Sequence, residues 1–303
     1  MNQRFKHISF FFALLIAFHF ALLWLYQQTE KKSEIVQLFE HYEENPVESK
    51  FLFLGASHTK RAINTSIVKS SYSLAFYGQN NINTYYVLKY LLENYGDNYE
   101  YICLPNDFGY YTKRAAINLD KKFFYKRFFN FNEYGKLSNT NYESWKEKLY
   151  QRYFPYVELK GMMSPKGERL AKENKDFSIY DEERKQKIAF NYIHNEHGID
   201  GTNKIYDSLS TTYLNMTLDL LKKHRKKAVF ISYPHSNAMQ QEIDEIGSYK
   251  HEEQALILNA GFEILDLSKA FLKHDEYFFD AHHLNKKGEI HFSHLIQEKL
   301  SSF

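Results

Sequence analysis

Five short apolar runs, separated by segments of helical periodicity, constrain the fold of this 303-residue chain most. Runs of four to six such residues are typical of strands buried in a sheet. Strands that alternate with helices pack as a parallel sheet with helices on both sides. We therefore expect an α/β fold with a central parallel sheet of about five strands. The expected strands are residues 51–54, 73–76, 101–104, 228–233 and 262–266, and the expected helices are residues 61–69, 84–94, 209–224, 239–259 and 286–300.

The N-terminus predicts a membrane anchor. Residues 8–26 contain only Ser9 and His19 as polar residues, and as a helix they match the thickness of a bilayer core. A cleaved signal peptide is the alternative, but its apolar region is shorter and small residues follow it. We expect residues 1–7 in the cytoplasm, a lipid-embedded helix over 8–26, a stalk over 27–49 and an extracytoplasmic domain over 50–303, since basic residues precede the helix.

The alternating pattern stops between residues 108 and 205, where we expect an insertion. It contains an aromatic and basic stretch over 121–129, which fits either a membrane surface or a packed helix with extended lysines. We favour the packed helix. An insertion of this length can serve as a lid or a substrate groove.

Ser57 follows the first expected strand and the permissive Gly55, so it lies at the carboxyl end of that strand. Open α/β sheets bind their ligands at this edge. The simpler alternative is that Ser57 only caps the following helix.

Asp280 and His283, three residues apart near the C-terminus, fit a base and its orienting carboxylate. On a tight turn both side chains face one side, and the carboxylate can reach His283 Nδ1. Serine becomes a nucleophile when such an imidazole lies within hydrogen-bond reach. Metal binding by Asp280, His282 and His283, with His291 and His294, is the alternative, although His291 and His294 fit solvated helix residues better. The sequence has no HExxH motif and no cysteine cluster, so we expect no metal.

Together these segments resemble the blocks of the SGNH (GDSL-like) hydrolase superfamily in order and spacing. The matching segments are Gly55-Ala56-Ser57, then Gly78, then Asn106, and finally Asp280 with His283. Ala56 stands where the family usually has aspartate, and no glycine precedes Asn106 in the third block. The resemblance implies a three-layer α/β/α fold and a Ser57-His283-Asp280 triad.

The same resemblance implies an oxyanion hole formed by Ser57, Gly78 and Asn106. Each preorganised donor aimed at the developing oxyanion is worth about 3–4 kcal/mol. Ordinary turn or capping roles are the alternatives for Gly78 and Asn106.

Composition argues against nucleic-acid-binding, cofactor-dependent and disulfide-stabilised classes of protein. The net charge is +2, and the chain has no repeat, zinc motif or phosphate-binding glycine loop, so we expect no nucleic-acid partner and no cofactor. Its single cysteine, Cys103, rules out an intrachain disulfide and fits a buried strand position. The 25 tyrosines and 26 phenylalanines fit sugar stacking or an aromatic core equally well.

Anchored proteins with these blocks resemble the extracytoplasmic acyltransferases that O-acetylate alginate-type polysaccharides or D-alanylate teichoic acids. That resemblance implies an acylated envelope glycan or acyl donor as substrate and a membrane-bound O-acyltransferase as partner. A plain carbohydrate esterase is one alternative, and a non-catalytic glycan-binding subunit is another. Transfer and hydrolysis would use the same residues.

Overall fold

A computed structural model describes residues 3–30, 34–107, 109–111, 176–196, 208–246 and 251–303. Two N-terminal helices, α1 (Gln3–Glu30) and α2 (Glu34–Glu44), fall mainly in a separate compact unit and are described by themselves. Within α1, the 22 residues His7–Gln28 have a mean hydropathy of 2.4 and are long and apolar enough to cross a membrane. The segment predicted as a stalk contains α2.

The second unit is built on a five-stranded parallel sheet, as expected. Its order is β2-β1-β3-β4-β5, and Phe51 of β1 pairs with Ser71 on one side and Tyr101 on the other. The chain therefore leaves β1 toward one edge of the sheet and then continues from β3 toward the other edge. The strands are β1 (Ser49–Phe53), β2 (Ser71–Ser73), β3 (Tyr99–Pro105), β4 (Lys227–Ser232) and β5 (Glu263–Asp266).

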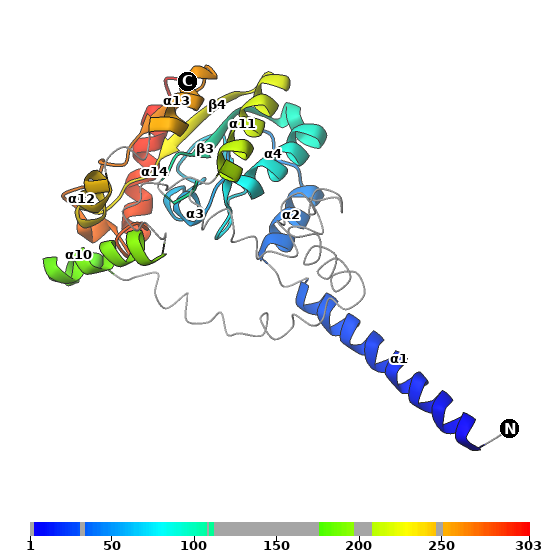
Figure 1. The fold of residues 1–303 in the computed structure, drawn as a ribbon. Helices are drawn as coiled ribbons and strands as arrows, with labels where there is room; N and C mark the ends of the chain where they lie inside the picture. The colour runs from blue at the N-terminus through cyan, green and yellow to red at the C-terminus, as the bar shows by residue number, and fades with distance from the viewer. Residues whose placement is uncertain (1–2, 31–33, 108, 112–175, 197–207, 247–250) are drawn as a thin grey trace. The chain divides into compact units, whose positions relative to one another are not determined.

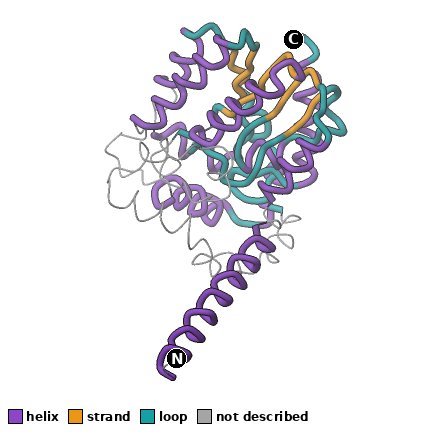
Figure 2. The backbone as a smooth tube through the Cα atoms, turned by 90° about the vertical axis from the view of Figure 1, so that its right-hand side faces the viewer, coloured by secondary structure: helices purple, strands orange, loops and turns teal. Residues whose placement is uncertain are grey.

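Helices cover both faces of this sheet, which gives the expected three layers (Figures 1 and 2). On one face α14 packs against α3 and α10 packs against α12. On the other face α11 packs against α4 and α13. The helices of this unit are α3 (Ser57–Ala62), α4 (Asn81–Tyr95), α10 (Glu182–Phe190), α11 (Ser208–Lys223), α12 (Asn237–Ile246), α13 (His251–Asn259) and α14 (Lys286–Leu300), with short turns at η1 (Gly96–Asn98), η5 (Phe177–Ile179) and η7 (Asp275–Tyr277) and a π-helical segment η6 (Asn191–Glu196).

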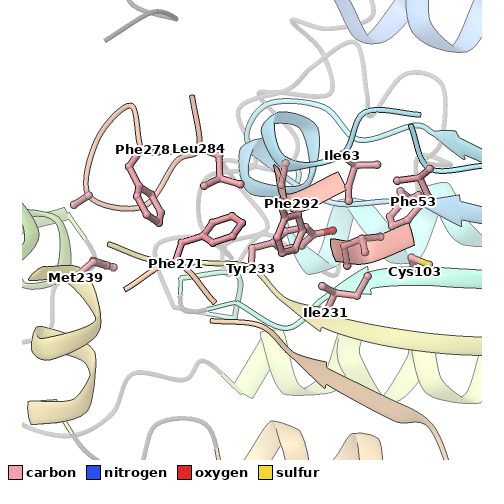
Figure 3. Close-up of a cluster of buried hydrophobic side chains, with 14 of the residues drawn as sticks. Phe53, Ile63, Cys103, Ile231, Tyr233, Met239, Phe271, Phe278, Leu284 and Phe292 are labelled. Atoms are coloured by element: carbon pink, nitrogen blue, oxygen red, sulfur yellow. The ribbon is translucent and has the colours of Figure 1, made fainter. Parts of the chain in front are cut away.

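The main hydrophobic core lies under the α3 and α14 side of the sheet (Figure 3). Alternate residues of the strands enter it, as the two-residue repeat of a strand requires. Phe53, Cys103 and Ile231 meet Phe292 of α14 there, and all four are at most 1% exposed. Full burial of a large apolar side chain contributes about 1.5–3 kcal/mol, so this cluster fixes α14 on the sheet. Cys103 is buried in β3, as expected.

Three of the predicted boundaries are wrong. The helix predicted over 61–69 begins at Ser57 and ends at Ala62, so Ala56 is the N-cap and the capping role considered for Ser57 is excluded. The strand predicted over 73–76 is β2, which pairs over 71–73, and the buried residues 74–76 follow it. The single helix predicted over 239–259 is two helices, α12 and α13.

The structure describes part of the predicted insertion. Its basic aromatic stretch over 121–129 lies outside the described residues. Residues 176–196 form η5, α10 and η6, and Phe177, Ala189 and Ile193 are fully buried in the main core. This part of the segment therefore belongs to the packed domain, although none of its described residues adds a strand to the sheet.

Candidate active site

The site lies where the sheet order reverses, between the carboxyl ends of β1 and β3. Neighbouring loops diverge at such a point and leave a crevice that α/β proteins use for ligands. The chain leaves β1 through Gly55, whose φ of +145° is disfavoured for residues with a side chain. A Cβ atom at this position would also lie 2.3 Å from Thr59 Oγ1. Glycine thus permits the sharp turn that places Ser57 in the first turn of α3.

The second half of the site is a tight loop before α14. It is closed by the hydrogen bond from Phe279 N to His283 O (2.8 Å) and by a bridge between Phe278 and Leu284. Asn285 stabilises this loop from both directions. Its side-chain oxygen caps α14 by accepting from Gly288 N (3.1 Å), and its Nδ2 donates to Phe278 O (3.2 Å).

The structure brings together the serine, histidine and aspartate predicted from sequence. His283 Nε2 lies 2.7 Å from Ser57 Oγ, and His283 Nδ1 lies 2.9 Å from Asp280 Oδ2. Asp280 Oδ1 also accepts hydrogen bonds from the backbone N–H groups of His282 (3.0 Å) and His283 (2.8 Å). Both side-chain distances are within the range for nucleophile, base and orienting carboxylate. Asp280 therefore holds the imidazole of His283 through Nδ1 and its backbone through N–H, and the other ring nitrogen, Nε2, faces the serine.

Burial and neighbouring charges set the protonation of this group. Burial lowers the pKa of His283, Asp280 opposes that shift, and the neighbouring His58 and Arg61 add to it electrostatically. Burial alone would raise the pKa of Asp280, but His282, His283 and the hydrogen bonds of the loop hold it below its usual range. At neutral pH the pair is an unprotonated imidazole beside a carboxylate, the state in which the imidazole can take a proton.

The two other predicted oxyanion residues lie near the same edge. Gly78 follows β2 in an exposed turn with a φ of +67°. Asn106 directly follows β3 and is buried, and its Nδ2 donates to Ser232 Oγ at 3.1 Å. A second N–H remains on that amide, because each carboxamide nitrogen carries two. Their role as donors to an oxyanion stays a prediction.

A second histidine and carboxylate pair, His58 and Asp107, was missed by the sequence analysis. His58 Nδ1 lies 3.1 Å from Asp107 Oδ2, and Asp107 Oδ1 accepts from Tyr233 N at 2.7 Å. This pair connects the first turn of α3, which follows β1, with the segment that leaves β3. The signal was present, because each residue directly follows a predicted site residue, Ser57 or Asn106, at the end of a neighbouring strand.

His282 occupies the other side of the base. Its ring stacks on Tyr192 of η6 at a centroid separation of 3.6 Å, and its Nδ1 lies 3.5 Å from Asp280 Oδ1. Burial holds its pKa well below the usual value. Through Tyr192, the end of the predicted insertion reaches the site. The sequence carries no pattern that pairs Tyr192 with His282.

Three histidines, His58, His282 and His283, could hold a metal ion, since their ligand atoms lie within 4.8 Å of one another. Asp107 and Asp280 orient two of these rings, as carboxylates do around bound zinc. However, a metal bound by His283 Nε2 would take the nitrogen that faces Ser57. His291 and His294 are exposed on α14 and are not members of this group.

Comparisons with known proteins add a distant likeness in fold. No protein-family model matches the chain, and no curated protein matches it. One similar solved structure, from Bacteroides fragilis NCTC 9343, is described as "a putative acylhydrolase". It is 12% identical, the match covers 87% of this chain and 93% of that chain, and the TM-score is 0.41.

Proposed function

We propose that the chain is a membrane-anchored serine esterase or O-acyltransferase of the SGNH type. The observation that carries this proposal is the hydrogen-bonded series from Ser57 Oγ through His283 to Asp280, with distances of 2.7 and 2.9 Å. Three residues from two distant segments meet in the geometry that acyl transfer requires. The order of the blocks along the sequence supports the SGNH assignment.

In the proposed reaction Ser57 Oγ attacks the carbonyl carbon of an ester, and its proton passes to His283 Nε2. The tetrahedral intermediate places negative charge on the carbonyl oxygen, where the Ser57 and Gly78 N–H groups and the Asn106 amide would donate. Collapse of the intermediate expels the alcohol, which takes the proton from His283 and leaves the acyl group on Ser57. Water or a sugar hydroxyl then loses its proton to His283 and attacks the acyl-enzyme. Collapse of the second intermediate breaks the bond to Ser57 Oγ, which takes the proton back from His283, and releases the free acid or the acylated sugar.

Labelling with a fluorophosphonate tests whether Ser57 is an activated nucleophile. We expect the wild-type protein to react and the Ser57→Ala variant to remain unlabelled. Ser66→Ala is the matched control. Ser66 is an exposed serine outside the proposed site, so this variant should be labelled like the wild type. Equal labelling of wild type and Ser57→Ala would contradict the proposal, and a folded wild type that does not react would favour a binding subunit.

For the substrate, we propose ester-linked acyl groups, represented by acetyl esters, on glycans of the cell envelope. The apolar length of His7–Gln28 supports a membrane anchor, and the basic residues before it support a domain outside the cytoplasm. A membrane-bound O-acyltransferase is the proposed partner that would supply the acyl group. Protease protection in inside-out and right-side-out vesicles would test the orientation.

Transfer and hydrolysis can be separated by the insertion. A sugar hydroxyl competes with water only if the acceptor is held against the acyl-enzyme. Residues 176–196 are packed in the core, so a shortened variant should remove residues only within 112–175. We expect that variant to lose transfer to an oligosaccharide and retain hydrolysis of a small activated ester, with its fold checked by circular dichroism. Unchanged partitioning between acylated oligosaccharide and free acid would favour the plain esterase.

A further inference from the structure

Arg61 lies on the same helix face as the proposed nucleophile. It is four residues after Ser57 in α3, and residues at that spacing are neighbours on a helix surface. The central guanidinium carbon lies 4.9 Å from the centre of the Phe279 ring and 5.6 Å from the centre of the Tyr77 ring. Phe279 directly precedes Asp280, and Tyr77 directly precedes Gly78. Arg61 is thus held between the two segments that flank Ser57.

Arg61 carries a positive charge beside the proposed base. Among the described residues no carboxylate forms an ion pair with it. Its positive charge reaches the proposed base, where it contributes to the lowered pKa of His283. Lys60 places a second cation 5.1 Å from the centre of the same Tyr77 ring. Two basic residues of α3 therefore lie beside the same aromatic ring.

Contact with aromatic rings leaves a guanidinium able to bind an anion. A ring that stacks on a guanidinium contacts the face of that planar group, while the N–H donors lie in the plane and point outward. Five donors in a fixed fork match the two oxygens of a carboxylate or a phosphate. A half-buried arginine held in this way can bind such a group without first giving up a protein carboxylate.

We infer that Arg61 binds an oxyanion, a carboxylate or phosphate, carried by the substrate of this site. The inference rests on the proposed function and narrows its substrate class to anionic esters. Because Arg61 borders the Gly78 and Asp280 segments, we place the anion on the alcohol half of the ester, the half that remains as the glycan. An anion on the acyl half of the ester could bind Arg61 in the same way, and the test distinguishes these two positions.

The test compares five ester probes on the full-length protein: two matched pairs and one phosphate probe. 4-Acetoxybenzoate and its methyl ester differ by a negative charge on the alcohol half. 4-Acetoxyphenyl phosphate places a phosphate there, and mono(4-nitrophenyl) succinate, compared with 4-nitrophenyl butyrate, places a carboxylate on the acyl half. Each is measured with wild type, Arg61→Gln and Arg61→Lys. Arg184→Gln is the matched control, because Arg184 lies 4.4 Å from the centre of the Tyr180 ring but on α10.

We expect Arg61→Gln to lower kcat/KM about ten- to hundredfold for probes with an anionic alcohol half, as loss of a charge-assisted hydrogen bond would. The loss should appear mainly as a higher KM. The kcat/KM of Arg61→Lys should lie between those of wild type and Arg61→Gln. Neutral probes should change less than about threefold, and Arg184→Gln should leave every probe unchanged. An effect confined to the succinate probe would move the anion to the acyl half and overturn the placement.

An equal loss on neutral and anionic probes would overturn the inference and assign Arg61 a structural role. Calorimetry separates this failure from failure of the proposed function. Binding of 4-hydroxybenzoate or inorganic phosphate by wild type, and its loss in Arg61→Gln, would support the anion site even if no ester were cleaved. Ester cleavage without any difference in anion binding would overturn the anion site and leave the esterase proposal standing.

Discussion

Asp280→Asn tests whether the carboxylate fixes the proton on the correct nitrogen of His283. In the structure Asp280 Oδ2 faces His283 Nδ1 at 2.9 Å, so Nδ1 carries the proton and Nε2 accepts from Ser57. The amide oxygen of asparagine can still accept the two backbone N–H groups that Oδ1 binds. Its NH2 group then faces Nδ1 and can only donate. The imidazole must move its proton to Nε2, where it can no longer take one from Ser57.

The expected loss follows from this tautomer change. An orienting carboxylate replaced by its amide typically lowers kcat by about 10⁴ with the geometry retained, which is about 5.4 kcal/mol of transition-state stabilisation. The global fold should remain, because the backbone hydrogen bonds of the loop keep an acceptor. We expect Tm to change by only a few degrees.

Hydrolysis of 4-nitrophenyl acetate and thermal unfolding measure the two effects separately. Asp181→Asn is the matched control, because Asp181 caps α10 by accepting from Arg184 N (2.8 Å) and asparagine caps equally well. It should retain full activity. Asp280→Asn activity within tenfold of wild type, in a protein whose Ser57→Ala variant is inactive, would refute the assignment of Asp280 as the orienting group.

The remaining predictions concern the base, its protonation and metals. Ser57→Ala and His283→Ala should each lower kcat by about 10⁶, whereas His282→Ala should have a mild effect, and the reverse order for the two histidines would identify His282 as the base. Because the pKa of His283 is lowered, kcat/KM should fall only as the pH drops well below about 6.5. The free energy of unfolding should also fall below about pH 6.5, since the unfolded chain takes up protons that buried His282 and His283 do not, which acid titration of unfolding would measure. Dialysis against EDTA should leave activity intact, and added zinc should inhibit by binding the histidine group. Loss of activity with EDTA and its recovery with zinc would instead indicate a metal-dependent mechanism and contradict the serine mechanism. Gly55→Ala should lower both Tm and activity, since its Cβ would clash with Thr59 Oγ1, and unchanged thermal unfolding would contradict that reason.

Sequence reasoning identified the sheet because buried strands have a local signature. Apolar runs identify where a strand is, but they do not distinguish a hydrogen-bonded strand from a buried loop. Leu74 and Phe76 are fully buried yet lie beyond the end of β2, so the predicted strand was displaced toward them. Their burial comes from the path of the chain toward the site, which no local pattern reports.

The predicted helix ends are wrong where a contact with a residue distant in sequence determines the boundary. Ser293 Oγ donates to the carbonyl of Ala62, at the end of α3, at 3.1 Å, and the same hydroxyl accepts from Asn64 N at 2.9 Å. Ser293 belongs to α14, so a contact across the whole domain ends the helix. The helix predicted over 239–259 failed for a related reason, because α12 packs against α10 whereas α13 packs against α11 and β5. One straight helix cannot reach both sets of neighbours.

The same long-range contacts explain why the residues of the site are easier to predict from sequence than their arrangement in space. The chemistry needs a serine, a histidine and a carboxylate, and these residue types can be read from a sequence. Their spacing in three dimensions depends on α3 and α14, which carry or adjoin Ser57 and His283 and are joined through Ser293. The reversal of strand order between β1 and β3 places the segments after both strands at the site, and the His58 and Asp107 pair connects those segments. The position of the site therefore follows from the topology of the sheet, while its geometry follows from the packing of these two helices.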